Sequence, residues 1–242
     1  MPPPAVSYND LAKQYGLAAT LESVVRLTQL VSKQDADMDE IGKLISKDIG
    51  LTASLLRAAN PRAESPADYT IDTVEDALMR TGLGCVLILA MSQPLSSALV
   101  KAFDMMLSLK LERLSPRAAL PLAGTNILGT IGFDGKASGC VFVRMSPASA
   151  KTIVSNILGM DSAELDDATV SDTIGELVNI MTGNFKSNLC DAGLDCRITP
   201  PSVRHTEEIE TPTVDGGGLE RMAFRTGPIT LFVDLAVNPW ND

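Results

Sequence analysis

A row of four residues in the second half of the chain has types and a spacing that could do chemistry. Asp172, Glu176, Asn179 and Gly183 follow one another at intervals of four, three and four residues. On an α-helix, where each residue turns by about 100°, this spacing places all four on one stripe. Carboxylates accept hydrogen bonds, and a carboxamide accepts and donates them without titrating. The stripe therefore presents two acceptors and an amide to solvent along a rigid rod.

The apolar residues around this row support the helix. They recur at spacings of three and four, which is the pattern of an amphipathic helix. These apolar residues are Ile174, Leu177, Val178, Met181 and Phe185. The pattern predicts a long helix over 167–190 that ends near Gly193 and packs its apolar stripe on a sheet.

Two glycines on the same predicted helix can be interpreted in two ways. Gly175 and Gly183 form a column with Asn179 at positions i, i+4 and i+8. Glycine inside a helix costs about 1 kcal/mol relative to alanine, so its presence needs a reason. The column could let the backbone of a partner approach closely, or the glycines could admit the sheet or a neighbouring helix. A Glu and an Asn three residues apart on an exposed helix face also occur commonly by chance.

The rest of the chain separates into a helical part and an α+β part. Helical periodicity predicts helices over 21–31, 39–45, 51–59, 73–80, 83–91 and 95–109. Strand-like runs then follow over 125–133, 137–145, 197–203, 221–225 and 229–237, with Asp134-Gly135 placed as a hairpin turn. Ser146-Pro147 predicts a capped helix that ends at Gly159. We therefore expect an all-helical domain over 8–94 and, over 95–242, an α+β domain whose antiparallel sheet is flanked by helices.

Composition excludes several classes of function. The formal net charge is −10 and no run of Lys or Arg stands out, which argues against nucleic-acid binding. The most apolar stretch, Cys85–Met91, has about seven residues, whereas a membrane span needs about 20. The four cysteines form no C-x-x-C pair, so neither a metal site nor a disulfide framework is indicated. We expect a cytoplasmic protein without a membrane segment.

The polar row resembles a motif of the CheC/CheX/FliY phosphatases, which reads Asp/Ser-x3-Glu-x2-Asn and is followed about twenty residues later by a proline. Here the proline is Pro200 or Pro201. A resemblance to CheX in particular is carried by the segment Ile174-Gly-Glu-Leu-Val-Asn-Ile-Met-Thr-Gly-Asn. The resemblance covers about 95–237. No second Glu-x-x-Asn occurs in 95–109, so the domain resembles the members with one site.

The resemblance implies dephosphorylation of the aspartyl phosphate of a CheY-like response regulator. Asn179 would hold the attacking water, and Glu176 would pair with the lysine of the receiver's active site. Asp172, Gly175 and Gly183 would contact the receiver. The receiver would bring its own Mg²⁺, so we expect no cofactor or metal bound by this chain. The alternative is a non-catalytic adaptor that binds receiver domains or other partners through both domains.

The first part of the chain resembles an HDOD domain. The residues that carry this resemblance run from Asp37 to Asp48 and from Leu51 to Asn60, followed by Ala77-Leu78-x-x-x-Gly82. They cover 17–94, about half of a usual domain, which suggests a truncated form. His205 is the only histidine, so the binuclear metal site of the related HD phosphohydrolases is excluded. CheX-type domains form homodimers through their sheet, so a dimer is expected.

Overall fold

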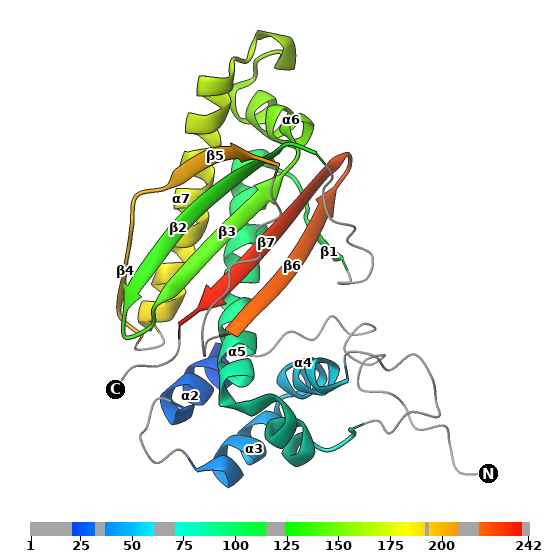
Figure 1. Cartoon of the computed structure of the whole chain (residues 1–242), viewed down its shortest axis with the longest axis vertical. Coiled ribbons are helices and arrows are strands. Elements are labelled where there is room, and N and C mark those ends of the chain that lie inside the picture. Colours follow the sequence, from blue (N-terminus) through cyan, green and yellow to red (C-terminus); the bar gives the residue numbers. More distant parts are fainter. Residues whose placement is uncertain are drawn as a thin grey trace, which may run out of the picture. The chain divides into compact units, whose positions relative to one another are not determined.

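The computed structural model describes residues 21–31, 37–60, 71–114, 124–191, 194–207 and 218–238. The chain divides into two compact units, residues 1–93 with 240–242 and residues 94–239. Helices come first and an antiparallel sheet with helices follows, so the predicted fold class is confirmed (Figure 1). The predicted start of the first domain at residue 8 lies outside the described residues.

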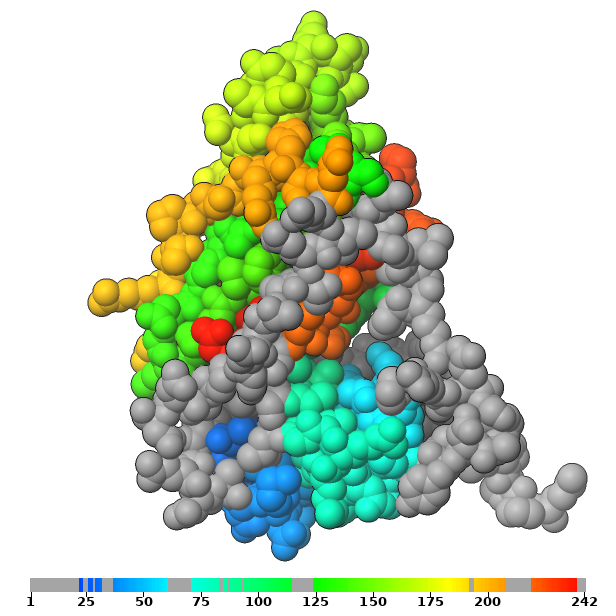
Figure 2. All heavy atoms as spheres, viewed as in Figure 1, coloured from blue at the N-terminus to red at the C-terminus, as the bar shows by residue number. Residues whose placement is uncertain are grey.

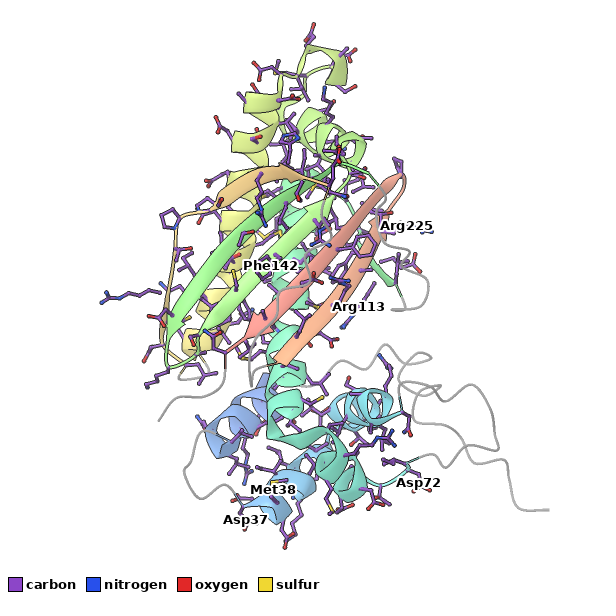
Figure 3. All side chains as sticks on the ribbon, in the orientation of Figure 1. Asp37, Met38, Asp72, Arg113, Phe142 and Arg225 are labelled. Carbon is purple, nitrogen blue, oxygen red and sulfur yellow. The ribbon has the colours of Figure 1, made fainter. Side chains whose placement is uncertain are left out.

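The described helices of the first unit are α2 (Leu21–Val31), α3 (Met38–Lys47), α4 (Ile49–Ala59) and the first part of α5 (Val74–Leu107). Aspartates begin two of them. Asp37 Oδ1 accepts the N–H groups of Asp39 and Glu40, at 2.9 and 3.3 Å, at the start of α3 (Figure 3). Asp48 Oδ1 accepts the N–H of Leu51 at 3.0 Å at the start of α4. These acidic residues are therefore helix caps.

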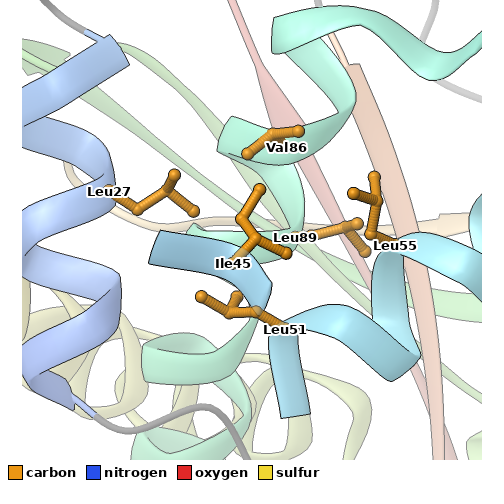
Figure 4. Close-up of a pocket in the computed structure, with 6 residues that line it drawn as sticks. All are labelled: Leu27, Ile45, Leu51, Leu55, Val86 and Leu89. Atoms are coloured by element: carbon orange, nitrogen blue, oxygen red, sulfur yellow. The ribbon is translucent and has the colours of Figure 1, made fainter. Parts of the chain in front are cut away.

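The core of the first unit is aliphatic. A narrow gap in it is lined by Leu27, Ile45, Leu51, Leu55, Val86 and Leu89 (Figure 4). No polar side chain lines the gap, and it is too tight to admit a water molecule. We interpret it as a packing imperfection between α2, α3, α4 and α5. Among the described helices, none is long and apolar enough to cross a bilayer.

Asn60 ties the end of α4 to the segment before α5. Its Nδ2 donates to the carbonyls of Leu56 and Ile71, at 2.9 and 2.7 Å, and its Oδ1 accepts the N–H of Ile71 at 2.9 Å. One side chain thus satisfies both backbone groups of Ile71, which is itself buried. The Asn60 position of the HDOD resemblance therefore has a structural role.

Asn60→Ala should destabilise the chain by about 1–3 kcal/mol, because it leaves buried backbone groups of Ile71 without partners. Asn60→Asp keeps the acceptors and loses the donors, so it should fall between the alanine variant and the wild type. Urea unfolding measures the difference, with Asn156→Ala on an exposed position as the control. Equal unfolding midpoints for Asn60→Ala and Asn156→Ala would contradict this role.

Helix α5 departs from the prediction at one of two expected breaks. The predicted end near Gly82 is confirmed, because Gly82 has a non-helical backbone (φ 74°, ψ 170°). The predicted break between helices over 83–91 and 95–109 is wrong, because α5 continues through Pro94 to Leu107. Proline removes only its own N–H and bends a helix without always ending it. The carbonyl of Pro94 accepts a hydrogen bond from Asn188 Nδ2 at 3.3 Å.

The second unit is built on one antiparallel sheet. Its strands are β1 (Glu112–Leu114), β2 (Asn126–Gly135), β3 (Gly139–Met145), β4 (Cys196–Ile198), β5 (Ser202–Thr206), β6 (Gly218–Thr226) and β7 (Ile229–Val237). They lie in the order β1-β6-β7-β3-β2-β4, and β5 also pairs with β2. Helices α6 (Pro147–Leu158) and α7 (Asp167–Asp191) pack on one face, with the short helix η1 (Ser162–Glu164) between them (Figure 1).

Three details of the sheet differ from the prediction. Asp134 and Gly135 are not the hairpin turn, because they extend β2 and pair with β4. The predicted strand over 197–203 is two strands, β4 and β5, because Pro200 and Pro201 cannot donate to the ladder. Strand β1 was not predicted. It pairs with β6 and brings Arg113 within 3.3 Å of Glu220 (Figure 3).

Candidate functional site

Helix α7 carries the predicted polar row, and its start is capped. Asp166 Oδ1 accepts the N–H of Thr169 at 2.7 Å, and this hydrogen bond lowers the pKa of Asp166. The predicted apolar stripe is confirmed, because all five of its residues are buried. They are Ile174, Leu177, Val178, Met181 and Phe185. The helix therefore rests on the sheet by the predicted face.

Close contacts with β2 fix the position of α7. Gly129 of β2 lies directly beneath Val178, since a Cβ at position 129 would be 2.8 Å from Val178 Cγ2. The rings of Phe133 and Phe185 meet edge to face, with their centroids 5.6 Å apart. A larger side chain at position 129 would therefore push the helix away. The same contacts therefore fix the positions of the residues on the outer face of α7.

The polar residues of the row lie at the surface. Asp172 and Glu176 are exposed, and Asn179 is half-buried. Within the described part of the chain, none of these three side chains makes a hydrogen bond or an ion pair. Two carboxylates and an amide are therefore free to bind groups from another molecule.

The two glycines of the row have different surroundings. A Cβ at Gly183 would have no atom within 4 Å, so this position is open. Gly175 is buried, and a Cβ there would lie 3.4 Å from Val203 Cγ2 and 3.9 Å from Pro201 Cγ. For Gly175 the structure therefore favours the second interpretation, in which the glycine admits the edge strand. Only Gly183 keeps the surface-contact interpretation.

Gly183→Leu should leave the fold intact, because open space surrounds the position and leucine is the better helix former by somewhat less than about 1 kcal/mol. If Gly183 lies in the contact surface, receiver phosphatase activity should nevertheless collapse, since about 1 Å of displacement can cost a hundredfold in rate. Thermal melting and phosphatase rates on the same preparation test this. A normally folded variant with an unchanged rate would remove Gly183 from the site.

Other chemistries find little support in the described residues. Burial raises the pKa of the Cys196 thiol to about 11 and also raises that of Cys140, so both thiols are protonated at neutral pH. No three His, Cys, Asp or Glu side chains of the described segments are grouped to hold a metal ion. His205 lies exposed on β5 and makes no contact that gives it a role. The α7 row remains the candidate site.

Two family models match the chain in succession. The model described as chemotaxis phosphatase CheX matches residues 127–219, and the HDOD domain model matches residues 17–120. The first part of the chain is therefore similar to HDOD domains, and the part that follows is similar to CheX. The CheX match includes the whole α7 row and both prolines. The HDOD match extends beyond residue 94, so the resemblance is longer than the sequence motifs indicated.

Solved structures agree on the fold of the CheX domain. Chemotaxis protein CheX from Vibrio vulnificus is 24% identical, with a TM-score of 0.54, and the match covers 61% of this chain and 96% of that one. A CheC-like superfamily protein from Shewanella sp. PV-4 is 22% identical, with a TM-score of 0.54 and coverages of 62% and 97%. The CheX–CheY–BeF3–Mg complex from Borrelia burgdorferi matches at 19% identity, with a TM-score of 0.51 and coverages of 62% and 98%. Among curated proteins, none matches this sequence.

Proposed function

We propose that the chain removes phosphate from the aspartate of a CheY-like receiver domain. The observation that carries this proposal is the outer face of α7. Glu176 and Asn179 lie there on a rigid helix, without partners inside the described part of the chain, within the segment that matches CheX. The complex of a CheX with CheY in Borrelia burgdorferi supports a receiver domain as the partner.

The chemistry needs little from the chain itself. An aspartyl phosphate is an activated acyl phosphate, so its hydrolysis requires mainly a water molecule in line behind phosphorus. The water oxygen bonds to phosphorus, the bond from phosphorus to the carboxylate oxygen breaks, and inorganic phosphate leaves with the water's protons. Asn179 accepts a hydrogen bond from this water and donates one to it, which fixes its direction of attack. Glu176 pairs with the active-site lysine of the receiver.

Metal ions enter only through the partner in this proposal. The receiver supplies the Mg²⁺ that balances the charge of the phosphate, and this chain needs no cofactor of its own. The net charge of −10 suits a receiver whose contact face is basic rather than a nucleic acid. We further propose a cytoplasmic homodimer, on the resemblance to CheX domains that pair through their sheets. Light scattering tests the dimer.

A turnover assay tests the function against its alternative. The purified chain is mixed with phosphorylated receivers, and the loss of phosphate is followed against each receiver alone. We expect at least one receiver to lose phosphate faster in the presence of the chain. An adaptor would bind a receiver and leave the rate of phosphate loss unchanged, and that result would contradict the proposal.

A further inference from the structure

The row on α7 is too small to be a complete docking surface. From Asp172 to Gly183 it is about 16 Å long and about 10 Å wide, the width of one helix. Even small specific complexes bury about 600 Å² on each partner. A receiver that reaches Glu176 and Asn179 must therefore also touch a surface beside α7. The contacts of Gly175 show what lies on one side.

An edge-strand bulge flanks α7 at the turn that bears Glu176. Pro201 and Val203 approach Gly175, at 3.9 and 3.4 Å from where its Cβ would lie. Asn179 is one turn further along and only about 40° around the helix from Gly175. The stretch Thr199–Pro201 joins β4 to β5 and is exposed throughout. Figure 2 shows the surrounding 194–207 segment, in orange, at the molecular surface.

The register with β2 identifies this stretch as a β-bulge. Ile198 pairs with Phe133 and Ser202 pairs with Thr130. Three residues therefore lie between the pairs on the edge strand, and only two lie between them on β2. A single extra residue is the signature of a bulge, and bulges at sheet edges commonly re-aim the chain beside functional sites.

Thr199 holds the bulge to the sheet. Pro200 and Pro201 have no N–H, so neither can donate a hydrogen bond to β2. Thr199 N–H donates to the carbonyl of Gly132 at 2.9 Å, and Thr199 Oγ1 accepts the N–H of Gly132 at 3.0 Å. Position 132 is small because a Cβ there would lie 3.3 Å from Thr199 Cγ2.

We propose that the Thr199–Pro201 bulge is a second contact for the receiver and that Thr199 is the residue that positions it. This inference rests on the proposed function, because its partner is the same receiver domain. Pro200 and Pro201 form a rigid, exposed rim, and Pro201 lies against α7 at Gly175. A receiver seated on the Glu176–Asn179 stripe is held by the rim against rotation about the helix. Affinity for the receiver therefore depends on Thr199. The position of the water held by Asn179, and with it the rate at saturating receiver, does not depend on Thr199.

The decisive variant is Thr199→Val, which keeps the shape and removes the hydroxyl acceptor. We expect the dissociation constant for a beryllofluoride-loaded, Mg²⁺-bound receiver to rise about three- to tenfold, because the bulge loses the two hydrogen bonds of the Thr199 hydroxyl, with Gly132 N–H at 3.0 Å and with the Pro200 carbonyl at 3.2 Å. The dephosphorylation rate at saturating receiver should stay within about twofold of the wild type. Thr199→Ser keeps the hydroxyl and should restore the affinity. Ser138→Ala, which loses the bond from Asn238 Nδ2 at 3.1 Å, is the control and should bind like the wild type.

A substitution of Gly132 also tests the hydrogen bonds by which Thr199 holds the bulge to β2. In Gly132→Ala the new methyl group presses on Thr199 Cγ2, so affinity should fall as in Thr199→Val. Gly132→Ala/Thr199→Ser removes that Cγ2 atom and should recover affinity. Wild-type affinity in both Thr199→Val and Gly132→Ala would overturn the inference, as would a lower saturating rate with unchanged affinity. If the wild type accelerates phosphate loss, such results reject the bulge alone; if it does not, the proposed function itself fails.

Discussion

Asn179→Ala should lower the rate of receiver dephosphorylation at saturation by about a hundredfold or more, while receiver affinity stays within a few-fold. The amide is free to hold a water molecule, because its side chain makes no hydrogen bond with any described residue of this chain. Without the amide, the water loses its fixed line of attack on phosphorus, and misplacement by about 1 Å can cost a hundredfold. The measurement is a single-turnover time course with a phosphorylated receiver.

Asn184→Ala is the matched control for this substitution. Asn184 lies on the same helix, is equally half-buried and is turned by about 140° around the helix from Asn179. It should keep the wild-type rate. Asn179→Asp, which preserves shape but brings a negative charge toward the phosphate, should be as slow as the alanine variant. An Asn179→Ala variant that retains most of its turnover would remove Asn179 from the role of positioning water.

Glu176→Lys should strongly weaken binding of the receiver. The proposed partner of Glu176 is a lysine, so the substitution replaces an attraction by a like-charge contact, which costs several kcal/mol in an interface. At about 1.4 kcal/mol for each factor of ten, affinity should fall at least roughly thirtyfold. Binding is measured with the beryllofluoride-loaded receiver, so that turnover does not interfere.

The fold should tolerate Glu176→Lys. The new lysine lies four residues after Asp172, a spacing that favours an ion pair along the helix. Asp191→Lys makes the same charge change at the far end of α7 and serves as the control. Glu176→Gln, which removes only the charge, should bind with intermediate affinity. Equal affinity of the wild type and the lysine variant would rule out the proposed pairing.

Helical periodicity allowed the site helix to be predicted from the sequence, but not its surroundings. The apolar stripe fixes which face of α7 meets the sheet, and the polar row follows from the same rotation. The two glycines could not be told apart in this way. Gly175 and Gly183 are rotated by about 80° from each other, and only the fold shows that the edge strand reaches the first of them.

The edge strand and α5 show two further limits of sequence reasoning. Residues 197–203 have the composition of one strand, yet the two prolines displace one residue from the ladder with β2. A register shift of this kind depends on the partner strand, which lies more than 60 residues away in sequence. The predicted break between 83–91 and 95–109 is absent, because Pro94 removes only its own N–H and α5 continues through it.

Receiver dephosphorylation in water labelled with heavy oxygen tests the proposed function of α7 directly. We expect the chain to accelerate phosphate release, the heavy oxygen to appear in the released phosphate, and Asn179→Ala to lose this acceleration. Label in the receiver's aspartate would show attack on carbon instead of phosphorus. That result, or a rate of phosphate release equal to that of the receiver alone, would contradict the proposed phosphatase activity.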